Sequence, residues 1–187
     1  FRSVLALTAT ATPEVVDDIQ VRLNFPQKNL FQKSFERQNL VYVVRYVEDK
    51  LEQLVHILNR VPGTSVVYVR SRKKTKEIAD FLVQQGVSAD YFHAGLSDEQ
   101  KDRKQKAWKS GDCRVIVSTN AFGMGIDKPD VRTVVHMDLP DTLEAYFQEA
   151  GRAGRDEQRA FAILLYNRTD ETKLKKRIND TFPDKER

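Results

Sequence analysis

The segment from Gln148 to Arg155 reads Gln-Glu-Ala-Gly-Arg-Ala-Gly-Arg, so two arginines stand three residues apart, each directly after a glycine. If this segment is helical, that spacing puts both guanidinium groups on one face. Guanidinium groups can clamp phosphate oxygens, and the glycines let a bulky ligand come close. The other interpretation is a solvated basic turn in which the arginines pair with Glu149 or Asp156. The rest of the chain favours a phosphate site.

The composition predicts one folded domain with a substantial core. The chain has 187 residues, of which 40% are hydrophobic and 31% charged, and it opens on Phe1 rather than Met, so we expect a piece of a longer protein. No apolar run is long enough to cross a membrane, so no membrane partner is expected. The single cysteine, Cys113, excludes an internal disulfide, and we expect it to pack in the core. A net charge of +4 permits nucleic-acid binding without establishing it.

Strand-like and helix-like segments alternate through the chain after residue 40, which is typical of βαβ units and a mainly parallel sheet. We expect strands at 40–47, 65–69, 89–92, 114–117, 133–137 and 161–166, and helices at 14–23, 49–59, 73–85, 98–109, 142–150 and 170–178. Several strands are continuous apolar runs, which predicts helices on both faces of an α/β fold. Trp108 is expected in the core, and Ser97 is expected to cap a helix.

Polar residues follow several of these strands, at the sheet edge where ligands of such folds gather. Ser71 and Arg72 follow the second strand, His93 follows the third, and a Gly-x-Gly segment that ends at Asp127 follows the fourth. Hydroxyls and backbone amides at such positions bind anions. Each residue also has a plainer interpretation, as a solvated helix start, a structural histidine or an ordinary turn.

Other nucleotide-binding patterns are missing from the sequence. It contains no Gly-x-x-x-x-Gly-Lys-Ser/Thr loop for a triphosphate and no Gly-x-Gly-x-x-Gly dinucleotide signature, and its three histidines show no metal-ligand spacing. Arginines without a triphosphate loop are typical of one half of a two-part NTPase. In such enzymes the arginines reach across a cleft to a nucleotide that is held elsewhere.

Four segments resemble the motifs of superfamily 2 helicases. Residues 6–12 resemble motif III, residues 67–72 motif IV, residues 118–131 motif V and residues 148–155 motif VI. The wording Ala-Phe-Gly-Met-Gly-Ile-Asp-Lys-Pro-Asp-Val-Arg, followed by Tyr-Phe-Gln-Glu-Ala-Gly-Arg-Ala-Gly-Arg-Asp, is similar to that of the RecQ DNA helicases. Residues 35–40 and 92–97 match the same family. The sequence departs from the family pattern at Gln38, Arg70 and Glu157, none of which is an expected phosphate ligand.

This resemblance implies a RecA-like three-layer αβα sandwich with a mainly parallel central sheet, which is the P-loop NTPase fold without the P-loop. Residues 1–39 would be a motif III remnant of a first helicase domain with a linker, residues 40–168 the second domain, and residues 169–187 a charged helix and tail. The whole protein would be an ATP-dependent 3′–5′ DNA helicase, bacterial and cytoplasmic or eukaryotic and nuclear. Its partners would be single-stranded or junction DNA and the upstream RecA-like domain. That upstream domain would make most of the contacts with ATP and Mg²⁺. The fragment alone is expected to be inactive.

The resemblance also assigns roles to single residues. Arg155 would be the arginine finger on the γ-phosphate, Arg152 would help to hold the triphosphate, and Gln148 would couple the site to DNA. The expected ATP-binding residues are Gly125, Asp127, Arg152 and Arg155. The expected DNA contacts are Ser71, Arg72, His93, Thr119 and Asn120, and the expected coupling residues are Thr8 and Thr10. Two alternatives stay open: a non-catalytic domain that binds nucleic acid or protein, and an RNA-directed superfamily 2 helicase.

Overall fold

The computed structural model describes residues 4–8, 11–25, 27, 30–31, 36–123 and 127–181. The chain divides into two compact units, Phe1–Arg37 and Gln38–Arg187. In the first unit, α1 (Pro13–Arg22) begins as predicted, with Pro13 as its first residue and the Thr12 hydroxyl accepting a hydrogen bond from the Val15 amide. None of the residues of this helix is buried.

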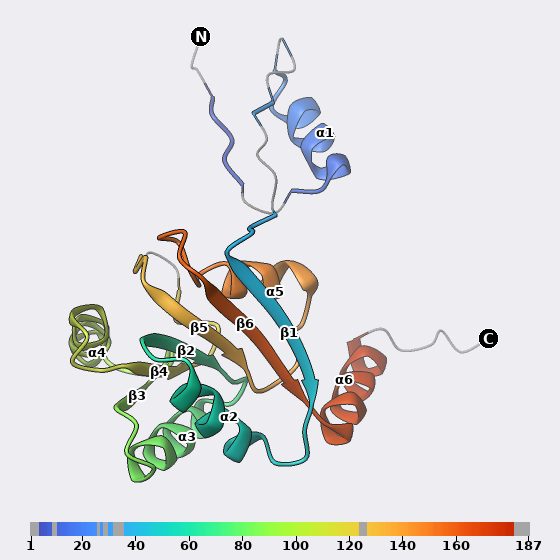
Figure 1. Cartoon of the computed structure of the whole chain (residues 1–187). Coiled ribbons are helices and arrows are strands. Elements are labelled where there is room, and N and C mark those ends of the chain that lie inside the picture. The colour runs from blue at the N-terminus through green and yellow to red at the C-terminus, as the bar shows by residue number, and fades with distance from the viewer. Residues whose placement is uncertain are drawn as a thin grey trace. The chain divides into compact units, whose positions relative to one another are not determined.

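The described part of the second unit forms one sheet of six parallel strands in the order β1-β6-β5-β2-β4-β3 (Figure 1). The strands are β1 (Leu40–Tyr46), β2 (Thr64–Tyr68), β3 (Ala89–Phe92), β4 (Val115–Ser118), β5 (Val131–His136) and β6 (Ala160–Tyr166). The helices are α2 (Lys50–Arg60), α3 (Arg72–Gln84), α4 (Asp98–Ser110), α5 (Leu143–Ala150) and α6 (Arg168–Thr181). The predicted RecA-like α/β fold is confirmed, and the element boundaries lie within a few residues of the predicted ones.

Helices cover both faces of the sheet (Figure 1), and a hydrophobic core lies on each side. Trp108 of α4 and Tyr146 of α5 pack in one core, while Leu54 of α2 and Leu82 of α3 pack in the other. Every residue of β2 and β4 is buried, as their continuous apolar sequences predict. The indole nitrogen of Trp108 donates to the Ser65 carbonyl at 3.2 Å, so the prediction that this residue lies in the core is confirmed.

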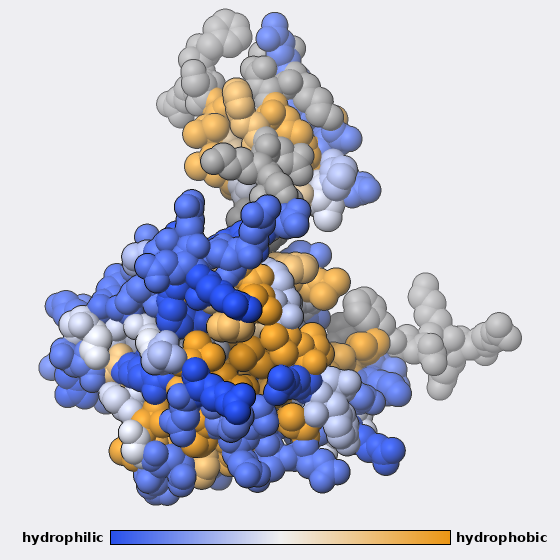
Figure 2. Space-filling model, viewed as in Figure 1, coloured by the Kyte–Doolittle hydropathy of each residue, from blue (hydrophilic) through white to orange (hydrophobic). Residues whose placement is uncertain are grey.

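The edge strand β1 departs from the expectation that both faces of every strand are covered. Apolar side chains are exposed there and on α5, and Figure 2 shows orange surface over this part of the second unit. Val44 of β1 is 62% exposed and Phe147 of α5 is 51% exposed. The short helix α5 therefore covers only part of the face formed by β1 and β6.

Two local predictions about helix ends and packing also hold. The Ser97 hydroxyl accepts from the Gln100 amide while the Gln100 side chain accepts from the Ser97 amide, which is a complete capping box at the start of α4. Cys113 is buried, and burial raises the pKa of its thiol to about 11.

Candidate functional site

The two arginines lie in a series of turns after α5, so they do not share one face of a helix, and the predicted end of the helix at residue 150 is confirmed. The helix begins at Leu143, where the Thr142 hydroxyl caps it, and ends at Ala150. Gly154 has a φ of +63° and donates its amide hydrogen to the Val131 carbonyl at 2.8 Å, in place of a helical partner. Local turn hydrogen bonds after α5, together with long-range contacts with β5, therefore place Arg152 and Arg155.

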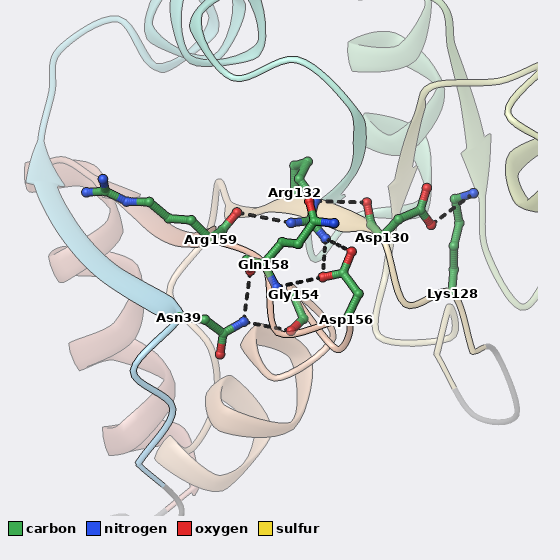
Figure 3. A network of polar contacts seen from close by, with 8 residues as sticks. All are labelled: Asn39, Lys128, Asp130, Arg132, Gly154, Asp156, Gln158 and Arg159. Carbon is green, nitrogen blue, oxygen red and sulfur yellow. Dashed lines mark hydrogen bonds and ion pairs between the residues drawn. The ribbon is translucent and has the colours of Figure 1, made fainter.

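A side chain on Gly154 would collide with its neighbours unless they moved. A Cβ added there would lie 2.7 Å from the Asn39 amide nitrogen and 2.8 Å from the Ala160 Cβ. The same Asn39 nitrogen donates to the Gly154 carbonyl at 2.7 Å and to the Gln158 carbonyl at 2.8 Å (Figure 3). The second glycine of the Gly-Arg-Ala-Gly-Arg segment thus lets the turn pack closely against the start of β1.

A second anchor ties the turn to β5. Arg132 donates to both carboxylate oxygens of Asp156, at 2.5 and 2.6 Å, and to the backbone carbonyls of Asp130 and Arg159 (Figure 3). The hydrogen bond from Arg132 holds the pKa of the Asp156 carboxyl below its ordinary value. Asp156, one of the two acids that could have paired with these arginines in a solvated turn, is therefore engaged by Arg132.

Both arginines reach the loop between β4 and β5. An Nη atom of Arg152 donates to the Gly123 carbonyl at 2.7 Å, and an Nη atom of Arg155 pairs with the Asp127 carboxylate at 2.6 Å. The Arg155 side chain is 40% exposed and that of Asp127 is 76% exposed. The structure thus brings three of the expected ATP-binding residues together, whereas the fourth, Gly125, lies outside the described residues.

The guanidinium group of Arg152 is tightly enclosed. Gly123 has a φ of +155°, and a Cβ added there would lie 2.0 Å from an Nη atom of Arg152. The Tyr68 hydroxyl donates to the neighbouring carbonyl of Phe122 at 2.9 Å. Burial raises the pKa of Tyr68, and the charge of Arg152 opposes this shift, which places the two groups near one another. Among the residues that the structure describes, the buried Nε of Arg152 has no hydrogen-bond partner.

Two expected DNA contacts meet at Gly95. A Cβ added to Gly95 would lie 3.3 Å from an Nη atom of Arg72 and 3.3 Å from the Nδ1 of His93. Arg72 opens α3, after β2, while His93 follows β3 and stacks on Tyr91 with ring centroids 5.8 Å apart. Ser71 is the N-cap residue of α3, but its hydroxyl makes no capping hydrogen bond. These side chains therefore present a donor cluster at one end of the sheet edge.

The other two expected DNA contacts line a cleft of about 150 Å³ at the carboxyl ends of β2, β4 and β5. Thr119 is buried at the end of β4 and donates its amide hydrogen to the Phe92 carbonyl at 3.4 Å, while Asn120 is exposed. Tyr68, His136 and Glu149 also line this cleft. The sheet edge therefore carries two polar clusters, one around Gly95 and one around the cleft.

The remaining predicted residues are placed less fully. Gln148 is exposed on α5, one helical turn before Arg152. Thr8 is exposed in the first unit, and Thr10 lies outside the described residues. Across the ranges that the structure describes, no group of three His, Cys, Asp or Glu residues could bind a metal ion, and no helix is long and apolar enough to span a membrane.

The sequence pattern did not predict the contact between His136 and Glu149. The Nε2 of His136 lies 2.8 Å from a carboxylate oxygen of Glu149, and the two side chains are 2% and 16% exposed. The sequence does contain a signal for this contact, since an ionisable residue ends the apolar run of β5. An acidic residue in the last turn of a helix is a second signal, because that position favours cations.

Comparisons with known proteins point in one direction. A model of the helicase conserved C-terminal domain matches residues 49–157. The chain is 40% identical over 182 residues to the RecQ-like DNA helicase blm-1 of Caenorhabditis elegans, which covers 95% of this chain and 18% of that protein. It is 42% identical over 168 residues to the ATP-dependent DNA helicase RecQ of Pasteurella multocida, which covers 89% of this chain and 27% of that protein. The chain thus spans less than a third of either relative.

Solved structures give a similar result. The DEAD-box protein SrmB of E. coli, bound to regulator of ribonuclease activity A, superimposes with a TM-score of 0.67 and 27% sequence identity. The match covers 73% of this chain and 82% of that one.

Proposed function

Because this chain belongs to the helicase conserved C-terminal domain family, within the RecQ DNA helicases, we propose that it is the second motor domain of an ATP-dependent 3′–5′ DNA helicase. Residues 40–168 are the domain itself in this proposal. Residues 1–39 are a motif III remnant of the first helicase domain with a linker, in which Thr8 and Thr10 couple the two domains, and residues 169–187 are a charged helix and tail.

The proposal depends above all on the contact of Arg152 and Arg155 with the β4–β5 loop. The enclosed guanidinium of Arg152 and the half-exposed one of Arg155 both contact this short loop. Their loop partners lie 29 and 28 residues away in the sequence. Within the described ranges the buried Nε of Arg152 has no hydrogen-bond partner, and the ion pair of Arg155 is open to solvent, so both groups suit a phosphate ligand. In our proposal Arg155 is the arginine finger, Arg152 helps to hold the triphosphate, and Asp127 and Gly125 lie near the nucleotide.

ATP supplies a phosphoanhydride bond whose hydrolysis releases free energy, and Mg²⁺ neutralises its phosphates. We assign most of the contacts with ATP and Mg²⁺ to an upstream RecA-like domain, because this chain has no triphosphate loop. The role of this chain is to place the guanidinium groups of Arg152 and Arg155 at the phosphates. On its own the chain is expected to hydrolyse no ATP.

We propose that five residues contact single-stranded DNA and together form a DNA track: Ser71, Arg72, His93, Thr119 and Asn120. These residues follow the three neighbouring strands β2, β4 and β3, so they form a row along the carboxyl edge. Hydroxyl, amide, imidazole and guanidinium donors suit a sugar-phosphate backbone and carry no base specificity. Gln148, on the exposed side of α5 near the arginine turn, is proposed to link this track to the nucleotide.

The decisive experiment measures ATP hydrolysis by the polypeptide that carries both helicase domains, with and without single-stranded DNA. Arg155→Ala is expected to lower DNA-stimulated kcat by about 10³- to 10⁵-fold, as loss of an arginine finger does elsewhere, while ATP still binds. Arg159→Ala is the matched control, because this nearby exposed arginine lies over the Phe161 ring and is not among the proposed ATP- or DNA-binding residues.

Three results would contradict the proposal in different ways. Turnover that is indifferent to Arg155 would favour a non-catalytic binding domain. Stimulation by RNA rather than DNA would favour an RNA-directed helicase. Arg155-dependent hydrolysis by the isolated chain would show that the upstream domain is dispensable.

A further inference from the structure

Glu149 occupies a position that does not suit an acidic residue. It lies in the last turn of α5, where the helix dipole favours cations and repels an additional negative charge. The carboxylate is also largely buried, at 16% exposure, and burial of a charge is costly unless a partner compensates it. The position of Glu149 therefore requires an explanation outside the helix, and His136 provides it.

The His136–Glu149 contact joins α5 to the central sheet. A carboxylate can only accept, so the hydrogen in the 2.8 Å contact belongs to the Nε2 of His136. The imidazole is held between two aromatic rings, with centroid distances of 5.2 Å to Tyr68 and 4.9 Å to Tyr146. The pair thus connects the last residue of β5, through a fixed ring, to the last turn of α5.

The same residue, Glu149, begins the turn that carries the arginines. Its backbone carbonyl accepts the amide hydrogen of Arg152 at 3.2 Å, while its side chain accepts from His136. Tyr68 supports the other side of the site, because its hydroxyl donates to the carbonyl of Phe122. The next residue, Gly123, accepts from the Arg152 guanidinium at 2.7 Å.

We propose that Tyr68, His136 and Glu149 form a positioning group for Arg152. Glu149 and His136 fix the backbone from which the arginine departs, and Tyr68 fixes the loop that receives its guanidinium. None of the three touches the nucleotide in this scheme, and all act through Arg152. The inference rests on the proposed role of Arg152 at the triphosphate, and its test separates the two.

A double-mutant cycle in the two-domain polypeptide tests this assignment. Glu149→Ala is expected to lower DNA-stimulated kcat by about 10- to 100-fold, because a displacement on the order of 1 Å at a catalytic group has an effect of this size. Glu149→Gln keeps an oxygen that accepts from His136, so it is expected to retain most of the activity. In an Arg152→Ala background, Glu149→Ala should cause no further loss, since residues that act through one another are not additive.

The readout excludes a purely structural role. A residue that matters only for stability would lower activity by the same factor whether or not Arg152 is present, and Glu149→Gln would give no selective rescue. Glu144→Gln is the control, because this acid lies on the same helix but is exposed in the first turn. If Glu149→Ala does not fold, Tyr68→Phe, which removes one hydroxyl, enters the cycle in its place with the same expectation.

The two failures are distinguishable. If Arg152→Ala has no effect on hydrolysis, the proposed function of the arginine site fails. If Arg152→Ala strongly lowers kcat and Glu149→Ala lowers it further by its full factor in the double variant, the proposed arginine site stands. The positioning group is then refuted.

Discussion

Replacing Gly123 by alanine should separate backbone strain from displacement of Arg152. The new Cβ would lie 2.0 Å from an Nη atom of Arg152, whereas ordinary contacts begin at 3.4 Å, so the guanidinium must move by 3.4 − 2.0 = 1.4 Å. If Arg152 holds the triphosphate, this movement should lower ATP turnover by about 10²-fold. Alanine at a φ of +155° also strains the backbone by about 1–3 kcal/mol.

The matched control is Gly111→Ala. Gly111 also has a positive φ, +93°, but a Cβ added there meets nothing within 4 Å, and the residue ends α4 away from the arginines. Both variants should lose stability in denaturant unfolding, whereas only Gly123→Ala should lose ATP turnover in the two-domain polypeptide. Equal turnover in the two variants would refute the reasoning that the close approach of Arg152 to Gly123 matters for activity.

Two further predictions concern ionisable groups. Arg132 holds the pKa of Asp156 below its ordinary value of 3.8, so the stabilisation from this pair is present above that value and is lost as the pH falls through the lower folded-state pKa. The difference in melting temperature between wild type and Asp156→Asn should therefore stay constant near neutral pH and shrink in acid; a pH-independent difference would count against the pair. Burial raises the pKa of Cys113 to about 11, so alkylation at neutral pH should be slow in the folded chain and fast after unfolding, and equal rates would contradict the burial.

The sequence predicts the sheet and its helices well because local patterns and the fold agree. The apolar run Val66–Val69 predicts a strand covered on both faces, and β2 is fully buried. Ser97 predicts the start of a helix, and it is the N-cap residue of α4. Such features depend on neighbours a few residues away, which a single sequence displays directly.

The geometry of the arginine turn could not be predicted because distant residues determine it. The amide of Gly154 binds the carbonyl of Val131, and Asn39 binds the Gly154 carbonyl from 115 residues away. The sequence predicts that the helix ends at Ala150, but it predicts neither of these contacts. The His136–Glu149 pair likewise depends on the packing of α5 against β5, and nothing in the spacing of these two residues specifies that packing.

The β4–β5 loop connects the proposed DNA-binding site to the proposed phosphate site, which is a physical reason why the two should influence each other. Its first residues, Thr119 and Asn120, belong to the proposed DNA track, and Asp127 near its other end binds Arg155. Thr119 is buried and tied to β3 through the Phe92 carbonyl, whereas the Arg155–Asp127 pair is exposed to solvent. An exposed pair of this kind contributes only about 0–1 kcal/mol, so a phosphate can displace Asp127 from Arg155 at little cost. Thr119, at the DNA-contacting end of the loop, is therefore held in place. We expect the rearrangement during turnover to occur at the Arg155–Asp127 pair.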